Sequence, residues 1–179
     1  MSTRGLAGVV IDGTIKASYN HSDSYPSWLG IRFLADAAKL AALSPDEYDN
    51  VMEAWREVIL VDEDVPPTAF DIATLEERGF TMQHPAEGDW YYLLHESQGS
   101  LDSMLKAGYV LDASEFGGDA LFCEWAYLID LTNRTLEVYA GESPVGRWPG
   151  GVGLVQKYSL DELPTEAAFL AALEPKQED

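Results

Sequence analysis

The spacing of apolar residues at the start of the chain predicts a pair of antiparallel strands. Residues 5–11 form an apolar run rich in β-branched side chains, and Asp12-Gly13 follows it as a typical two-residue hairpin turn. Residues 14–19 continue as a second strand-like segment. We therefore expect the chain to open with a β-hairpin.

A longer alternation of apolar and polar residues covers 121–131 and predicts a strand. Thr132-Asn133 gives a short turn, after which 135–139 returns as the hairpin partner. We expect this hairpin to lie at the centre of the sheet, and 152–158 to supply a last strand. The residues predicted to share one face of the strand over 121–131 are Leu121, Cys123, Trp125, Tyr127, Ile129 and Leu131.

Helical periods and capping signals occupy the middle and the end of the chain. Ser44-Pro45-Asp46-Glu47 combines a capping serine, a proline at the first helical position and a glutamate three residues after the cap. Gly79 and Gly108 end two further helical segments, whereas 89–96 is strand-like. The predicted helices span 28–43, capped by Ser27, and then 45–58, 68–78, 101–107 and 166–173.

Strands near both ends with helices between them indicate an α+β fold, with a mainly antiparallel sheet and helices packed on it. The 179 residues, 46% of them hydrophobic, suffice for one domain with its own core. We find no internal repeat and no linker between domains. We expect a single domain over residues 1–175 and a frayed acidic tail over 176–179.

Acidic residues outnumber basic ones by 31 to 11, which gives a formal net charge of −20. A chain with so few cations cannot neutralise many phosphates, so we exclude nucleic-acid binding by phosphate contact and binding to anionic membrane surfaces. The segment 40–130 carries most of the excess, and 46–64 is its densest part. This pattern favours either a docking surface for a basic protein partner or an exposed face that keeps the protein soluble.

The sequence also lacks the signals of membrane proteins, secreted proteins and metal-binding proteins. No window approaches the length of about 18 apolar residues that a membrane helix needs, and the first residues do not form a secretory signal. We therefore expect a cytoplasmic protein. The single cysteine, Cys123, excludes an internal disulfide, and the three histidines lack metal-ligand spacing. We predict no metal and no cofactor.

A polar and aromatic stretch, 19–30, lies between a predicted strand and a predicted helix, where scaffolds often present functional groups. Its imidazole and carboxylate, His21 and Asp23, are candidates for acid and base catalysis. The same residue types also stabilise turns by bonding to their own backbone, so a structural role is the alternative. The candidate ligand-binding residues are Tyr19, Asn20, Tyr25 and Trp28 of this stretch, together with Arg4, Cys123 and Glu124 outside it.

Three separated blocks carry a resemblance: Thr3-Arg4-Gly5, the Tyr-Asn-His-x-Asp-Ser-Tyr-Pro pattern within 19–30, and Cys123-Glu124-Trp125-Ala126-Tyr127. In these blocks the chain resembles a family of short, largely uncharacterised proteins from actinobacteria, their phages and other microbes. The resemblance implies a microbial or phage-encoded protein, and it implies no particular activity.

Ser2 supports one concrete enzyme hypothesis. After removal of the initiator methionine it becomes a free serine amine directly ahead of a strand, which resembles the N-terminal-nucleophile hydrolases. In this hypothesis the Ser2 hydroxyl attacks an acyl carbon, its own amine acts as the base, and Arg4, Asn20 or Asp23 orients the substrate. Serine also follows methionine in many proteins that have no such activity.

Cys123 is a second candidate nucleophile, which one of the histidines could activate. Its place on the apolar face of a strand favours instead a buried thiol with a raised pKa. Glu124 points to the other side of that strand, where it is either exposed or held by Arg4 or Arg32.

Our leading hypothesis is an acidic, non-enzymatic, phage-encoded protein that works in the host cytoplasm and binds another protein with a basic surface. The rival hypothesis is an amide hydrolase that uses Ser2. A third hypothesis is a small-ligand binding module with a pocket lined by Tyr19, His21, Tyr25 and Trp28.

Overall fold

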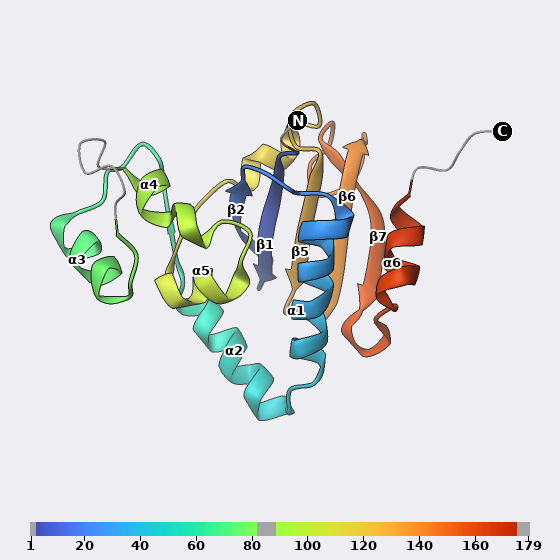
Figure 1. The fold of residues 1–179 in the computed structure, drawn as a ribbon, viewed down its shortest axis with the longest axis horizontal. Helices are drawn as coiled ribbons and strands as arrows, with labels where there is room; N and C mark the ends of the chain where they lie inside the picture. Colours follow the sequence, from blue (N-terminus) through green and yellow to red (C-terminus); the bar gives the residue numbers. More distant parts are fainter. Residues whose placement is uncertain (1–2, 82–88, 175–179) are drawn as a thin grey trace.

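The computed structural model describes residues 3–81 and 89–174, and within these ranges the strands form one large and one small sheet (Figure 1). The strands are β1 (Gly5–Ile11), β2 (Thr14–Asn20), β3 (Ile59–Val61), β4 (Tyr109–Leu111), β5 (Trp125–Asp130), β6 (Thr135–Glu142) and β7 (Val152–Ser159). The large sheet has the order β2-β1-β5-β6-β7, in which β1 and β5 run parallel and the other neighbours run antiparallel. The small sheet pairs β3 with β4 in parallel. The predicted α+β class is confirmed.

Local turn and cap chemistry explains why these elements begin and end where they do. Asp12 and Gly13 have φ angles of 50° and 80°, as a two-residue hairpin turn requires, so the predicted β1–β2 hairpin is confirmed. Ser44 and Glu47 form the predicted capping box. Gly108 ends a helix in the left-handed conformation, at φ 73°. The helices are α1 (Ile31–Ala41), α2 (Pro45–Glu57), α3 (Ala69–Glu77), α4 (Trp90–Leu94), α5 (Leu101–Ala107) and α6 (Glu166–Leu173).

The strand predicted over 89–96 is wrong. This segment forms α4, followed by a 3-10 turn over His95–Ser97. The Asp89 side chain caps the helix by accepting a hydrogen bond from the backbone N–H of Tyr92 at 3.1 Å. Leu93 and Leu94 are buried with Trp90, at a spacing that only a helix gives. The strand prediction followed from the high strand propensity of the aromatic residues, and it overlooked the helical spacing of the apolar side chains.

Two predicted element boundaries are also wrong. Ser27 does not cap a helix, because it lies inside a short π-helix over Pro26–Gly30 that precedes α1. The carbonyl of Tyr25, directly ahead of this π-helix, accepts the N–H of Trp28 at 3.0 Å. The strand predicted over 121–131 begins only at Trp125. A turn closed by Asp119, whose carbonyl accepts the Cys123 N–H at 2.8 Å, precedes it.

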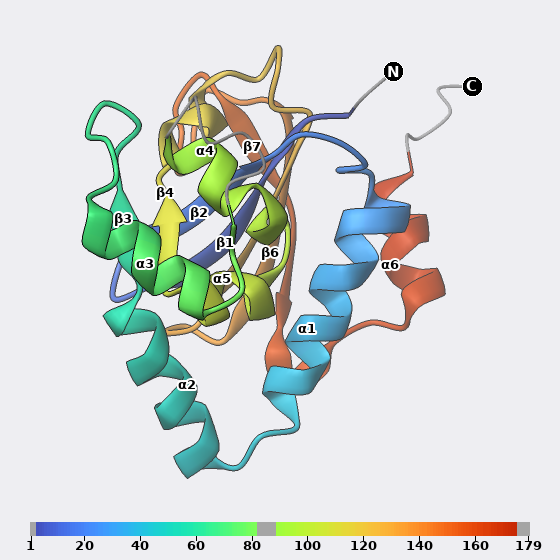
Figure 2. The same cartoon turned by 60° about the vertical axis from the view of Figure 1, so that its left-hand side comes forward.

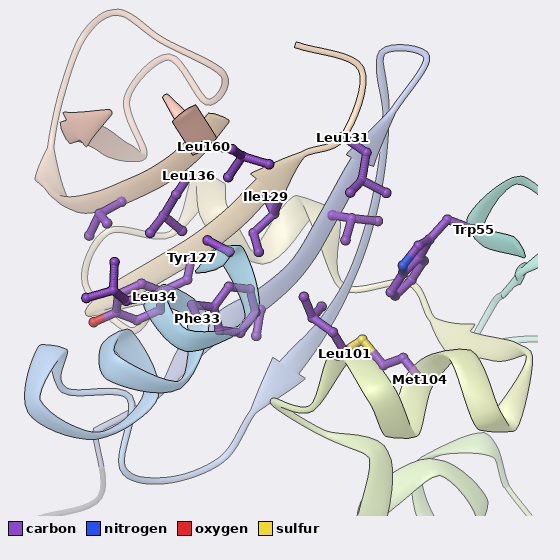
Figure 3. Close-up of a cluster of buried hydrophobic side chains, with 14 of the residues drawn as sticks. Phe33, Leu34, Trp55, Leu101, Met104, Tyr127, Ile129, Leu131, Leu136 and Leu160 are labelled. Carbon is purple, nitrogen blue, oxygen red and sulfur yellow. The ribbon is translucent and has the colours of Figure 1, made fainter. Parts of the chain in front are cut away.

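Helices cover one face of the large sheet and create the main core (Figure 3). Tyr127 and Ile129 of β5 point into this core together with Phe33 from α1, and Trp55 from α2 belongs to the same core further along it. Burial of such large apolar side chains contributes roughly 1.5–3 kcal/mol each, so this face provides much of the stability. The hairpin β5–β6 lies beside β1 in the middle of the sheet, as predicted.

Irregular segments cover the opposite face of the large sheet. A 3-10 helix, η3 (Ser114–Gly118), and the loop 143–151 lie over a second core that contains Leu128 and Tyr139. The indole N–H of Trp148 donates to the Ser114 carbonyl at 2.7 Å. This contact joins the two covering segments to each other.

A smaller lobe of α3, α4, β3 and β4 lies beyond the β2 edge of the large sheet (Figure 2). Lys16 of β2 fixes its position. The buried Lys16 ammonium donates to the carbonyls of Trp55, Arg56 and Val58 at 2.8, 3.0 and 2.6 Å, at the C-terminal end of α2. Because β3 begins directly after these carbonyls, Lys16 holds the lobe beside β2.

Candidate functional site

The junction between β2 and the small sheet contains two adjoining depressions. The backbone N–H of Asp112 donates to Val61 at 3.0 Å, and that of Ala113 donates to Ala17 of β2 at 3.0 Å. These bonds bring the end of β4 between β3 and the large sheet. We call the depressions the acidic hollow, of about 460 Å³, and the cavity, of about 250 Å³. Glu63 and Asp112 line both of them.

Five carboxylates line the acidic hollow, and they come from the two segments that follow β3 and β4. Because these strands are parallel, their C-terminal ends meet at the same edge of the small sheet. Asp62 and Asp112 are held by turns in which their side chains accept the backbone N–H groups of residues 64 and 114, both at 2.9 Å. The carboxylates belong to Asp62, Glu63, Asp64, Asp112 and Glu115.

None of these five carboxylates forms an ion pair with another residue of the described ranges 3–81 and 89–174. The basic side chains of those ranges that do pair lie elsewhere, for example Arg134 with Asp161 at 3.0 Å and Arg56 with Asp12 at 2.7 Å. The hollow therefore carries concentrated negative charge that the paired cations do not neutralise. A cationic ligand would relieve the repulsion among these carboxylates.

The cavity lies next to the hollow and has a mixed lining. Ser18 of β2 lines it, is almost fully buried, and its hydroxyl has no hydrogen-bond partner in the described part of the chain. Tyr19 contributes to the wall and packs edge-to-face on Phe116 of η3, with ring centroids 5.2 Å apart. Burial raises the pKa of Tyr19, so the phenol stays protonated. Tyr91 of α4 lines the same space.

The three blocks that carry the family resemblance meet at Ser24. The Ser24 N–H donates to the carbonyl of Thr3 at 3.2 Å, and its own carbonyl accepts the Tyr127 hydroxyl at 3.0 Å. The Asn20 amide donates to the Ser24 hydroxyl at 2.8 Å. The backbone of Arg4 accepts the Glu124 N–H at 3.1 Å. Ser24 is fully buried, so this part of 19–30 anchors the loop to the sheet.

The predicted catalytic residues lie at the surface where the structure describes them. His21 and Asp23 are exposed, and the His21 Nδ1 atom lies 3.2 Å from the Tyr19 hydroxyl. Asp23 has a φ angle of 58°, which fits a residue that shapes a turn. Ser2 lies outside the described residues, as does the predicted tail over 176–179. The hydrolase hypothesis therefore stays a prediction.

The predicted ligand-binding residues do not gather at either of the two depressions. Tyr25 and Trp28 are exposed, and neither lines the cavity or the acidic hollow, whereas Tyr19 lines the cavity. Arg4 is exposed and its guanidinium lies 5.7 Å from the centre of the Phe122 ring. Glu124 is exposed as well.

Cys123 is fully buried, but it packs with the core on the opposite side of the sheet from Tyr127, so the prediction that the two share one face of a strand is wrong. Burial, together with the nearby charges of Asp119 and Glu124, raises the pKa of the Cys123 thiol to about 12. A protonated, inaccessible thiol is a poor nucleophile. This environment supports the buried-thiol interpretation of Cys123 over the catalytic one.

A buried network of charged residues was not predicted from the sequence. Glu137 of β6 accepts from Arg147 Nη2 at 2.9 Å, from Lys157 Nζ at 3.1 Å and from the Tyr139 hydroxyl. Asp130 of β5 lies 3.3 Å from the same Arg147 nitrogen. Burial alone would raise the pKa of Glu137, but these hydrogen bonds and the Arg147 charge outweigh it and lower the pKa. Because its members satisfy one another, the network anchors the loop 143–151 to the sheet.

Comparison of the chain with protein-family models, curated proteins and solved structures finds no match. Among the described residues, no helix has both the length and the apolar character that a membrane crossing requires. Residues 3–81 and 89–174 also contain no group of three or more His, Cys, Asp or Glu side chains arranged to hold a metal ion.

The residues that line the two depressions escaped sequence reasoning, apart from Tyr19 and the acidic run 62–64. Asp112 and Glu115 lie about 50 positions further along the chain. The usable signal is that each acidic segment follows a short apolar run, 59–61 or 109–111, since such runs are typical of buried parallel strands.

Proposed function

We propose that this protein binds a second protein, and that a lysine- and arginine-rich surface of that partner docks at the acidic hollow. The observation that carries this proposal is the set of five carboxylates without an ion-pair partner among the described residues, gathered from two strands at one opening. A solubilising surface has no need to concentrate like charges in a concave site.

The charge of the whole chain supports the same function. A net charge of −20 attracts a cationic partner over several ångströms and raises the rate of encounter. The exposed acidic residues of α2, in the same densely charged segment 46–64, extend this field. The hollow then provides the short-range contacts that determine where the partner binds.

A binding assay with matched variants tests the proposal. The probe is a fluorescently labelled synthetic peptide of alternating glycine and lysine, and the measurement is its dissociation constant by fluorescence anisotropy. The hollow variant replaces four carboxylates of the site with amides. The control variant makes four such changes at exposed acidic residues of α3, η4 (Leu160–Glu162) and the end of α6. The hollow changes are D62N, E63Q, D112N and E115Q, and the control changes are E76Q, E77Q, E162Q and E174Q.

We expect the hollow variant to bind the peptide about tenfold more weakly than the native chain. Four exposed charge contacts of roughly 0.3–0.5 kcal/mol each add up to about 1.2–2 kcal/mol, which spans the 1.4 kcal/mol that a tenfold change requires. The control variant loses the same amount of negative charge, but its changes lie outside the hollow, so only the long-range attraction weakens. We therefore expect its dissociation constant to change by less than about threefold. Equal weakening of binding in both variants would contradict the proposal, because the site would then be irrelevant.

A further inference from the structure

We propose that the cavity next to the acidic hollow receives the side chain of one arginine from the bound partner. This inference rests on the proposed function and adds the chemical identity of a central contact. The two depressions adjoin, since Glu63 and Asp112 line both, so a residue seated in the hollow can extend its side chain into the cavity.

Ser18 marks the cavity as a ligand site. The residue is only 5% exposed, and its Oγ atom has no hydrogen-bond partner among the described residues. A buried hydroxyl in this state has given up its bonds to water without replacement, which costs free energy. A donor group that enters the cavity can supply the missing bond.

The size and lining of the cavity fit a single long cationic side chain. Its volume of about 250 Å³ lies below the range of roughly 300–1,000 Å³ that pockets for larger ligands occupy. Glu63 and Asp112 supply carboxylate acceptors. Leu94 and Leu111 supply apolar surface for the methylene groups of the side chain.

The two tyrosines in the wall favour arginine over lysine. Tyr19 and Tyr91 both line the cavity. A guanidinium group is planar, stacks on aromatic rings and is weakly hydrated, whereas an ammonium group is compact and strongly hydrated. A guanidinium group also has five N–H donors, enough to reach a carboxylate and the Ser18 hydroxyl together.

The test compares two labelled peptides of equal length and charge, one alternating glycine with arginine and the other glycine with lysine. Dissociation constants are measured for the native chain, for Tyr91→Ala and for Ser18→Ala, with unfolding in urea as a check that both variants fold. Tyr91 is half-buried and Ser18→Ala is a small change, so the native fold should persist. The hollow variant described above is measured with both peptides.

We expect the native chain to bind the arginine peptide about fivefold more tightly than the lysine peptide, as one partly desolvated cation–π contact would give. In Tyr91→Ala this preference should fall below about twofold, while affinity for the lysine peptide stays the same. Ser18→Ala should weaken binding of the arginine peptide by roughly threefold, through loss of one hydrogen bond.

Two failures can be told apart. If both peptides bind the native chain equally well and the hollow variant weakens both, the arginine inference is overturned and the proposed function stands. If neither peptide binds, or the hollow variant binds both as tightly as the native chain does, the proposed function fails and the inference fails with it. Equal weakening of both peptides by Tyr91→Ala also overturns the inference.

Discussion

Glu137 lies at the centre of the buried charge network, so its replacement by glutamine should destabilise the protein substantially. Glu137 is 2% exposed, and its carboxylate accepts from Arg147 at 2.9 and 3.0 Å and from Lys157 at 3.1 Å. Breaking a buried ion pair by removing one partner costs about 3–5 kcal/mol. Arg147 and Lys157 retain contact with water, and Asp130 still neutralises Arg147, so we expect about 2–3 kcal/mol.

The assay is urea unfolding at neutral pH, followed by circular dichroism, with Asp161→Asn as the control. The Asp161 pair with Arg134 has a similar distance, 3.0 Å, but the Asp161 side chain is 70% exposed, so the control should lose less than about 1 kcal/mol. A loss below about 1 kcal/mol in Glu137→Gln would refute the reasoning, because the network would then contribute no more than a surface pair.

The stabilising contribution of Glu137 should decrease on acidification. The pKa of Glu137 is lower in the folded protein than in the unfolded chain, so its stabilising contribution is complete above the unfolded value of about 4.3. That contribution is lost as the pH falls through the lowered folded value. The difference in unfolding free energy between the native chain and Glu137→Gln should therefore be constant near neutral pH and shrink below about pH 4. A difference that grows on acidification would contradict this assignment.

Two further predictions concern the residues that fix the lobe and the second core. Lys16→Met should reduce the free energy of unfolding by roughly 2 kcal/mol in urea titrations, because three carbonyls at the end of α2 lose their donor; a loss near zero would show that Lys16 does not fix the lobe. Cys123 should react with a soluble thiol reagent at least about a hundredfold more slowly in the folded protein than in urea, since burial raises its pKa to about 12; equal rates would place the thiol at the surface.

Local sequence signals predicted the elements whose ends depend on a few neighbouring residues. The capping box at Ser44 and the left-handed glycine at 108 determine helix ends by short-range bonds, so the residues alone sufficed. The segment 89–96 shows the opposite case. Its aromatic side chains have a high strand propensity, but the segment forms a helix because residues three and four positions apart are buried together in the core of the lobe.

The candidate site could not be predicted in the same way, because it depends on contacts between distant segments. The acidic run 62–64 was evident from the sequence, but its meeting with Asp112 and Glu115 follows from the parallel pairing of two three-residue strands. Nothing local specifies that pairing. The unpartnered hydroxyl of Ser18 likewise becomes apparent only once the lobe lies against β2.

The most direct test of the central claim is a map of backbone amide chemical shifts while the glycine–lysine peptide is added to isotope-labelled protein. If the partner surface docks at the acidic hollow, the largest shifts will fall on residues 62–64 and 112–115, with smaller ones along α2. Shifts confined to the exposed face of α6, or spread evenly over all acidic segments, would contradict the account.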